Sequence, residues 1–116
     1  MIKVKRIYEE PADDDGYRVL VDRLWPRGVA RQDAALDEWC KSITPSNELR
    51  KWFHEETCGR WREFCSKYKE ELCKADEDLD RLAEIASDSG LTLLTAAKNR
   101  QRNHALVLKE VLSGEG

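Results

Sequence analysis

The chain has 116 residues, of which 41% are hydrophobic and 37% are charged, and its formal net charge is −3. This length predicts one domain, residues 1–116, with one hydrophobic core that needs no disulfide or metal to fold. The slight excess of acid disfavours nucleic-acid binding, because phosphate contacts require a local excess of lysine and arginine. No apolar run is long enough to span a membrane and the charged N-terminus lacks a secretory signal, so we expect a cytoplasmic protein with no membrane partner.

The four cysteines are interpreted as core residues rather than as ligands or disulfides. None of their spacings forms the Cys-x-x-Cys pair that lets two thiolates reach one zinc ion. A reducing cytoplasm also keeps thiols free. We therefore expect Cys40, Cys58, Cys65 and Cys73 to pack as small apolar side chains, and we predict neither a metal nor a cofactor.

Two strands are predicted in the first quarter of the chain. Residues 2–7 alternate apolar and charged side chains, which is typical of a half-buried strand. After a polar turn at Asp13–Gly16, the segment Tyr17–Leu24 is rich in β-branched and aromatic residues. Its continuously apolar centre, Val19–Val21, indicates a strand covered on both faces. The turn residues Trp25–Gly28 end it, because proline removes a backbone donor.

The segment that follows allows two interpretations. In residues 29–43, the apolar residues Ala34, Leu36, Trp39 and Ile43 fit helical spacing. The second half of the segment also fits a short edge strand, and both alternatives stay open.

Helices dominate the rest of the chain. Ser46 is predicted to cap a helix that carries Leu49, Trp52 and Phe53 on one face, and Thr57 to cap a second helix. Asp76 is predicted to cap a third helix, which Gly90 ends. A second buried strand at residues 91–97 and a final helix complete the pattern. The expected apolar faces of the second and last helices are Cys58, Trp61, Cys65, Tyr68 and Leu72, and Ala105, Leu108, Val111 and Leu112.

Two apolar strands separated by helices predict an α/β fold: a three-layer sandwich with a small, mostly parallel sheet flanked by helices. In open sheets of this kind, ligands bind outside the carboxyl ends of the strands. The two buried strands and the helix that follows the second one bring seven candidate ligand-binding residues to that edge: Asp22, Arg23, Trp25, Arg27, Lys98, Asn103 and His104.

The candidate residues indicate a pocket for a small anionic ligand, such as a phosphate, a carboxylate or a similar oxyanion. Arginine and lysine supply positive charge, and the start of the last helix supplies unpaired N–H groups. In this hypothesis Asp22 orients an arginine, and His104 carries a proton near neutral pH.

Structural roles are the alternative for the same residues. Asp22 and Arg23 can form an ion pair that only fastens the strand end, and His104 can be a hydrogen-bonded structural histidine. For the whole protein, the alternative function is a non-catalytic interaction module or a homodimer, with the aromatic residues at the contact. Whether the protein is an enzyme stays open.

Four segments carry a resemblance to a known family: Val21–Gly28, Asn47–Phe53, Leu93–Lys98 and Asn103–Ala105. Together they resemble the YeaO-like proteins, a prokaryotic domain of unknown function, over almost the whole chain. The resemblance implies a three-layer α/β fold and a cytosolic protein, and it implies no established activity.

Two departures from the family pattern limit the chemistry that the resemblance implies. Longer relatives, similar to rhodanese-type folds, have a Cys-His-Arg triplet where this chain has Asn103-His104-Ala105, so thiol chemistry at that position is excluded. Family members commonly have an aspartate where this chain has Asn99, which removes a carboxylate base from that position.

Overall fold

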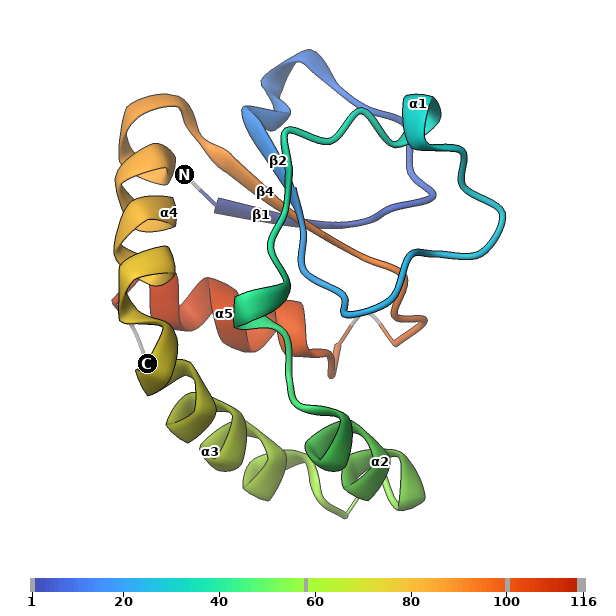
Figure 1. The fold of residues 1–116 in the computed structure, drawn as a ribbon, viewed down its shortest axis with the longest axis vertical. Helices are drawn as coiled ribbons and strands as arrows, with labels where there is room; N and C mark the ends of the chain where they lie inside the picture. Colours follow the sequence, from blue (N-terminus) through green and yellow to red (C-terminus); the bar gives the residue numbers. More distant parts are fainter. Residues whose placement is uncertain (1, 58, 100, 115–116) are drawn as a thin grey trace.

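The computed structural model describes residues 2–57, 59–99 and 101–114, and within them it contains one four-stranded parallel sheet. The strands lie in the order β1 (Ile2–Arg6), β4 (Leu91–Thr95), β2 (Tyr17–Leu20) and β3 (Glu38–Trp39). Every neighbouring pair is parallel, so the carboxyl ends of all four strands lie at the same edge (Figure 1). The α/β class and the parallel sheet are confirmed.

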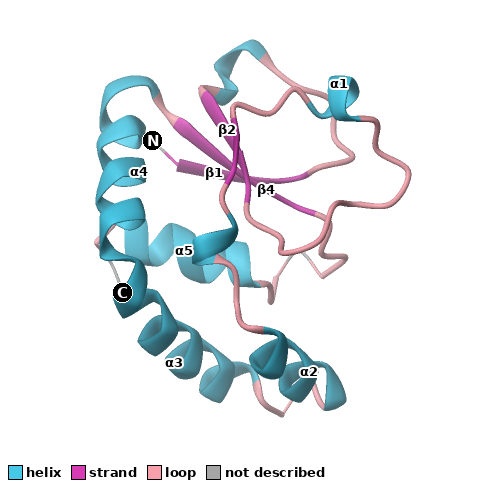
Figure 2. Ribbon diagram, in the orientation of Figure 1, coloured by secondary structure: helices cyan, strands magenta, loops and turns pink. Residues whose placement is uncertain are grey.

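The two faces of the sheet are covered differently. Val19 and Leu93 point into the main core, which the long helices enclose, whereas Leu20 and Leu94 point into a smaller core on the other face. Figure 2 shows the long helices gathered on one side and mostly loops on the other. The helices are α2 (Asn47–Glu55), α3 (Trp61–Leu72), α4 (Asp76–Ser89) and α5 (His104–Leu112), and the loop side carries the single turn α1 (Arg31–Ala34). The layer that covers the smaller core is therefore mostly loop, with α1 as its one helical turn in the described structure.

Both alternatives for residues 29–43 are correct in part. The segment forms α1, then the two-residue edge strand β3, then a 3-10 turn at Lys41–Ile43. Ala35 ends α1 because its φ of 50° is left-handed. The backbone N–H of Asp37 then donates to the carbonyl of Arg18 at 2.9 Å, which starts the pairing of β3 with β2.

The predicted helix starts are right at one position and wrong at two. The hydroxyl of Ser46 accepts from the backbone N–H of Leu49 at 3.1 Å, so its role as a cap is confirmed. Thr57 caps nothing, because α3 begins four residues later, after Arg60. Asp76 is the first residue of α4 rather than its cap, because a 3-10 turn at Cys73–Ala75 joins α3 to α4 without an extended residue between them.

The ends of the elements and the faces of the helices follow the prediction more closely. Gly90, with a φ of 86°, ends α4 as expected. The buried face of α3 includes Tyr68 and Leu72 as predicted, together with Phe64, which the prediction missed. Among the described residues, no helix is both long and apolar enough to cross a bilayer.

The expectation that the cysteines are buried holds for one of the three that the structure describes. Cys40 lies in the main core, Cys65 is half-buried and Cys73 is exposed. Burial raises the pKa of the thiols of Cys40 and Cys65 above the ordinary value. The fourth, Cys58, lies outside the described residues.

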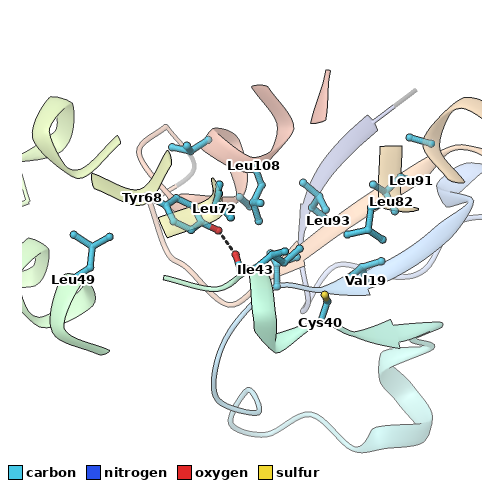
Figure 3. Packing of buried hydrophobic residues seen from close by; sticks show 14 of the residues in the cluster. Val19, Cys40, Ile43, Leu49, Tyr68, Leu72, Leu82, Leu91, Leu93 and Leu108 are labelled. Atoms are coloured by element: carbon cyan, nitrogen blue, oxygen red, sulfur yellow. Dashed lines mark hydrogen bonds between the residues drawn. The ribbon is translucent and has the colours of Figure 1, made fainter. Parts of the chain in front are cut away.

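Tyr68 links α3 to the 3-10 turn at Lys41–Ile43. Its ring is fully buried, and its hydroxyl donates a hydrogen bond to the backbone carbonyl of Ile43 (Figure 3). We expect Tyr68→Phe to lower the free energy of unfolding by about 1–3 kcal/mol, because the buried carbonyl loses its partner. Urea unfolding measures this change.

The control for that experiment is Tyr8→Phe. Tyr8 is 48% exposed, and its hydroxyl donates to the carbonyl of Arg27 at 3.1 Å, where water can replace it. Its loss should cost less than about 0.5 kcal/mol. Equal effects of the two substitutions would contradict the role given to the buried hydrogen bond.

Candidate functional site

The carboxyl ends of β2 and β4 open into a cavity of about 600 Å³. Its walls come chiefly from the segment after β2, from the segment after β4 with the start of α5, and from the end of α2. The structure places all seven predicted residues around this one cavity: Asp22, Arg23, Trp25, Arg27, Lys98, Asn103 and His104. β2 and β4 are adjacent and parallel, which is why residues more than 70 positions apart in the sequence meet here.

Asp22 holds the two strand ends together. One oxygen of its carboxylate, Oδ1, accepts from the hydroxyl of Thr95 at 2.7 Å, and the other, Oδ2, accepts from the backbone N–H of Ala96 at 2.7 Å. Its backbone carbonyl accepts from the indole N–H of Trp39 at 2.7 Å. Burial alone would raise the pKa of Asp22, but the donors from His104, Ala96 and Thr95 outweigh it and hold the pKa below its ordinary value.

His104 is the first residue of α5 and the third partner of Asp22. Its Nε2 lies 2.8 Å from the carbonyl oxygen of Val21 and 3.0 Å from Oδ1 of Asp22. Both of these atoms accept hydrogen bonds, so we assign the ring hydrogen to Nε2. In the neutral ring, Nδ1 is then the atom able to accept a proton.

The partner of Asp22 therefore differs from the one that the sequence suggested. No ion pair joins Asp22 to an arginine among the described residues, and the structure places His104 next to the carboxylate instead. The alternative, a structural ion pair between Asp22 and Arg23, is therefore absent from the described structure as well. Instead, the Nε of Arg23 donates to the backbone carbonyl of Pro45 at 3.3 Å, just before α2. The histidine takes the carboxylate because α5 starts directly over the end of β2.

Two of the predicted residues line the cavity, but their polar groups already form hydrogen bonds within the protein. The indole N–H of Trp25 donates to the carbonyl of Val29 at 2.8 Å, so this residue offers only its ring. Asn103 caps α5: its Oδ1 accepts from Leu106 at 3.1 Å, and its Nδ2 donates to the carbonyl of Asn99 at 2.8 Å.

Three basic side chains of this cavity were not predicted from the sequence, namely Arg50 and His54 of α2 and Arg102 before α5. Arg50 lies within Asn47–Phe53, one of the segments that carry the family resemblance, but its spacing does not predict that α2 reaches the carboxyl edge of the sheet. Arg102 could have been found, since it lies between Lys98 and His104 in the sequence. The side chain of Asn99 folds this loop by accepting from the backbone N–H groups of Gln101 and Arg102 at 2.9 and 3.0 Å.

The lining of the cavity includes the hydroxyl groups of Thr57 and Thr95 and the amine of Lys98. No cysteine lines it in the described part of the chain. The hydroxyl of Thr95 donates to Asp22 and accepts from the N–H of Ala97 at 3.1 Å, so it is not available as a nucleophile. Residues 2–57, 59–99 and 101–114 contain no group of three His, Cys, Asp or Glu side chains arranged to hold a metal ion.

The sequence matches a known protein family over nearly its whole length. The sequence model of the inactive DUF488-N3 subclade matches residues 1–115. The chain belongs to this family. It is 52% identical over 111 residues to the uncharacterized protein YeaO of Escherichia coli, covering 96% of each chain. It is 43% identical over 116 residues to the uncharacterized protein Rv3073c of Mycobacterium tuberculosis, covering 97% of this chain and 94% of the relative.

These similarities confirm the resemblance to YeaO-like proteins that the four sequence segments carried. The uncharacterized protein Mb3100c of Mycobacterium bovis is also 43% identical over 116 residues. No solved structure gives a significant match. Family membership thus extends over nearly the whole chain.

The role of the Asp22 carboxylate leads to a prediction about stability and pH. Asp22→Asn replaces two acceptor oxygens by one oxygen and an NH₂ group that meets donors, so we expect a loss of about 1–3 kcal/mol at pH 7. The pKa of Asp22 is lowered in the folded state. Its contribution is thus complete above the unfolded pKa of about 3.9 and is lost as the pH falls through the folded value.

Denaturant unfolding at pH 7 and pH 3 measures this effect. The difference between wild type and Asp22→Asn should narrow at pH 3. Asp80→Asn is the control, since Asp80 is an exposed carboxylate of α4, and it should change stability by less than about 0.5 kcal/mol at either pH. A loss for Asp22→Asn that is the same at both pH values would mean that the charge of the carboxylate does not matter.

Proposed function

We propose that this protein binds a small anionic ligand, a phosphate, a carboxylate or a similar oxyanion, in the cavity at the carboxyl ends of β2 and β4, and that it does so in the cytoplasm. One observation carries the proposal. Five arginine or lysine side chains line the cavity, and the single described carboxylate among the lining residues is already bound on three sides. The five cations are Arg23, Arg27, Arg50, Lys98 and Arg102.

The charge around the cavity runs against the composition of the chain. The whole protein has 23 acidic and 20 basic residues, yet within the described residues none of the five cations pairs with a carboxylate. A concave site lined by one sign of charge attracts the opposite ion more strongly than a flat surface does. Arginine also matches the geometry of phosphate and carboxylate with two parallel hydrogen bonds.

In this proposal the protein binds the anion without using a cysteine thiol at the start of α5. Asn103 occupies the position of the cysteine in the longer relatives, and its amide is used to cap α5. The description of the family as inactive supports the same interpretation. His104 then serves as a ligand contact: its Nε2 is fixed by Val21 and Asp22, which leaves Nδ1 as the atom able to donate to an anion once the ring is protonated.

The distribution of apolar surface favours this proposal over an interaction module. Among the described residues, Tyr8 and Leu24 are the large hydrophobic side chains that count as exposed, at 48% and 66%. Both line the cavity. No separate apolar patch of the described surface therefore points to a partner protein or to a second copy of the chain.

Ligand-induced stabilisation tests the proposal. We expect inorganic phosphate, sulfate and acetate to raise the melting temperature of the wild type at constant ionic strength, since a ligand that binds only the folded state stabilises it. Lys98→Ala and Arg102→Ala should each weaken phosphate binding about three- to tenfold, because each removes a charged donor at the mouth.

The matched control for the arginine variant is Arg62→Ala. Arg62 is an exposed arginine of α3 that does not line the cavity. It carries the same charge, so a nonspecific effect of net charge would appear equally in this variant. The same phosphate response in wild type, Arg62→Ala, Lys98→Ala and Arg102→Ala would overturn the proposal.

A further inference from the structure

We propose that the ligand is an organic anion whose charged group is attached to an aromatic body, rather than an inorganic ion. This inference rests on the proposed function and names the class of ligand. It depends on how charge and apolar surface are divided between the mouth and the inside of the cavity.

The mouth of the cavity is cationic, and its inner wall combines apolar side chains with Thr95 and Asn103, whose polar groups are already hydrogen-bonded within the protein. Arg27, Lys98 and Arg102 are exposed and therefore lie at the opening. The inner wall includes Phe53 and Phe64, which also line the cavity but are only 7% and 3% exposed. Pro26 and Pro45 are buried lining residues too, and Ala96 and Ala97 are half-buried. A ligand that fills this space meets cations with one end and apolar side chains with the other.

The size of the cavity favours an organic molecule. Its volume of about 600 Å³ lies within the range of roughly 300–1,000 Å³ that is typical of sites for organic ligands. An inorganic oxyanion held by the cations at the mouth would leave water against the inner apolar wall. Displacing such water by an apolar group is favourable.

The side chains inside suit an aromatic ring in particular. The rings of Phe53 and Phe64 have centroids 4.5 Å apart, and they belong to a cluster with Trp61. A further ring can pack against such a cluster by its face or its edge, and guanidinium groups stack on aromatic faces. Leu24 is 66% exposed and lies at the mouth, so a bound ring that extends from the inner wall to the mouth would also remove its apolar surface from water.

Calorimetric titration with three phosphates tests this inference. Phenyl phosphate, methyl phosphate and inorganic phosphate are compared at pH 7.5 and constant ionic strength, so that the anionic head is matched. We expect phenyl phosphate to bind at least about tenfold more tightly than methyl phosphate, because only its ring reaches the apolar wall.

Two variants separate the parts of the site. Leu24→Ser should weaken phenyl phosphate about threefold or more and leave methyl phosphate unchanged, and the exposure of Leu24 makes the substitution compatible with the fold. Arg102→Ala should weaken both esters by the same factor. Intermolecular NOEs from the phenyl protons to the rings of Phe53 and Phe64 should locate the bound ring.

The outcomes distinguish this inference from the proposed function. Equal affinity for phenyl and methyl phosphate would overturn the inference and leave anion binding in place. NOEs from the phenyl ring to exposed side chains alone would also overturn it. If none of the three phosphates binds, or if phenol binds as tightly as phenyl phosphate, the proposed function fails as well.

Discussion

The carboxylate of Asp22 is the interaction on which the geometry of the cavity depends. It joins β2, β4 and the first residue of α5 at one point, because Thr95, Ala96 and His104 all donate to it. An ionised carboxylate is costly to bury unless its oxygens are satisfied, and charge-assisted hydrogen bonds offset that cost. Asp22 precedes all three partners by more than 70 positions in the sequence, so its carboxylate fixes how the ends of the two strands and the start of α5 lie relative to one another.

The same arrangement divides the lining residues into a framework and a set of free cations. Asp22, Thr95, Asn99, Asn103 and the indole N–H of Trp25 are all used in hydrogen bonds within the protein. This framework holds the loops after β2 and β4 in place. Of the cations that these loops carry, Arg23 is tied to the carbonyl of Pro45, whereas Arg27, Lys98 and Arg102 line the cavity and form no ion pair with a described carboxylate.

The position of the site could be predicted from the sequence, but the partners within it could not. Asp22 and Lys98 directly follow apolar strands, and the rule that parallel strands end at a common edge brings them together without any coordinates. The pairing of Asp22 with His104 depends on where the start of α5 lies over β2, and periodicity does not encode that position. Arg50 and His54 were missed for the same reason, since the position of α2 depends on its packing against α3.

Local signals succeeded where one residue determines the structure and failed where neighbours compete. Ser46 and Gly90 act through their own side chain or backbone, and both were predicted correctly. Thr57 and Asp76 have good capping side chains, but the connections between α2, α3 and α4 leave neither of them at the extended position that a cap requires. Residues 29–43 divide between a single helical turn and a two-residue strand, and the pairing of Glu38 and Trp39 with β2 decides where the strand lies.

The distribution of charge is the strongest physical indication that the cavity has a purpose beyond folding. Elsewhere in the molecule buried charges are matched: Asp15 accepts from Lys5, Arg18 and the backbone of Ala12, and these donors overcome the effect of burial and lower its pKa to about 2. At the cavity, several cations share a concave surface, and the one carboxylate among the described lining residues already accepts hydrogen bonds within the protein. This contrast between the two sites is the physical basis of our proposal that an anion from outside the chain binds at the cavity.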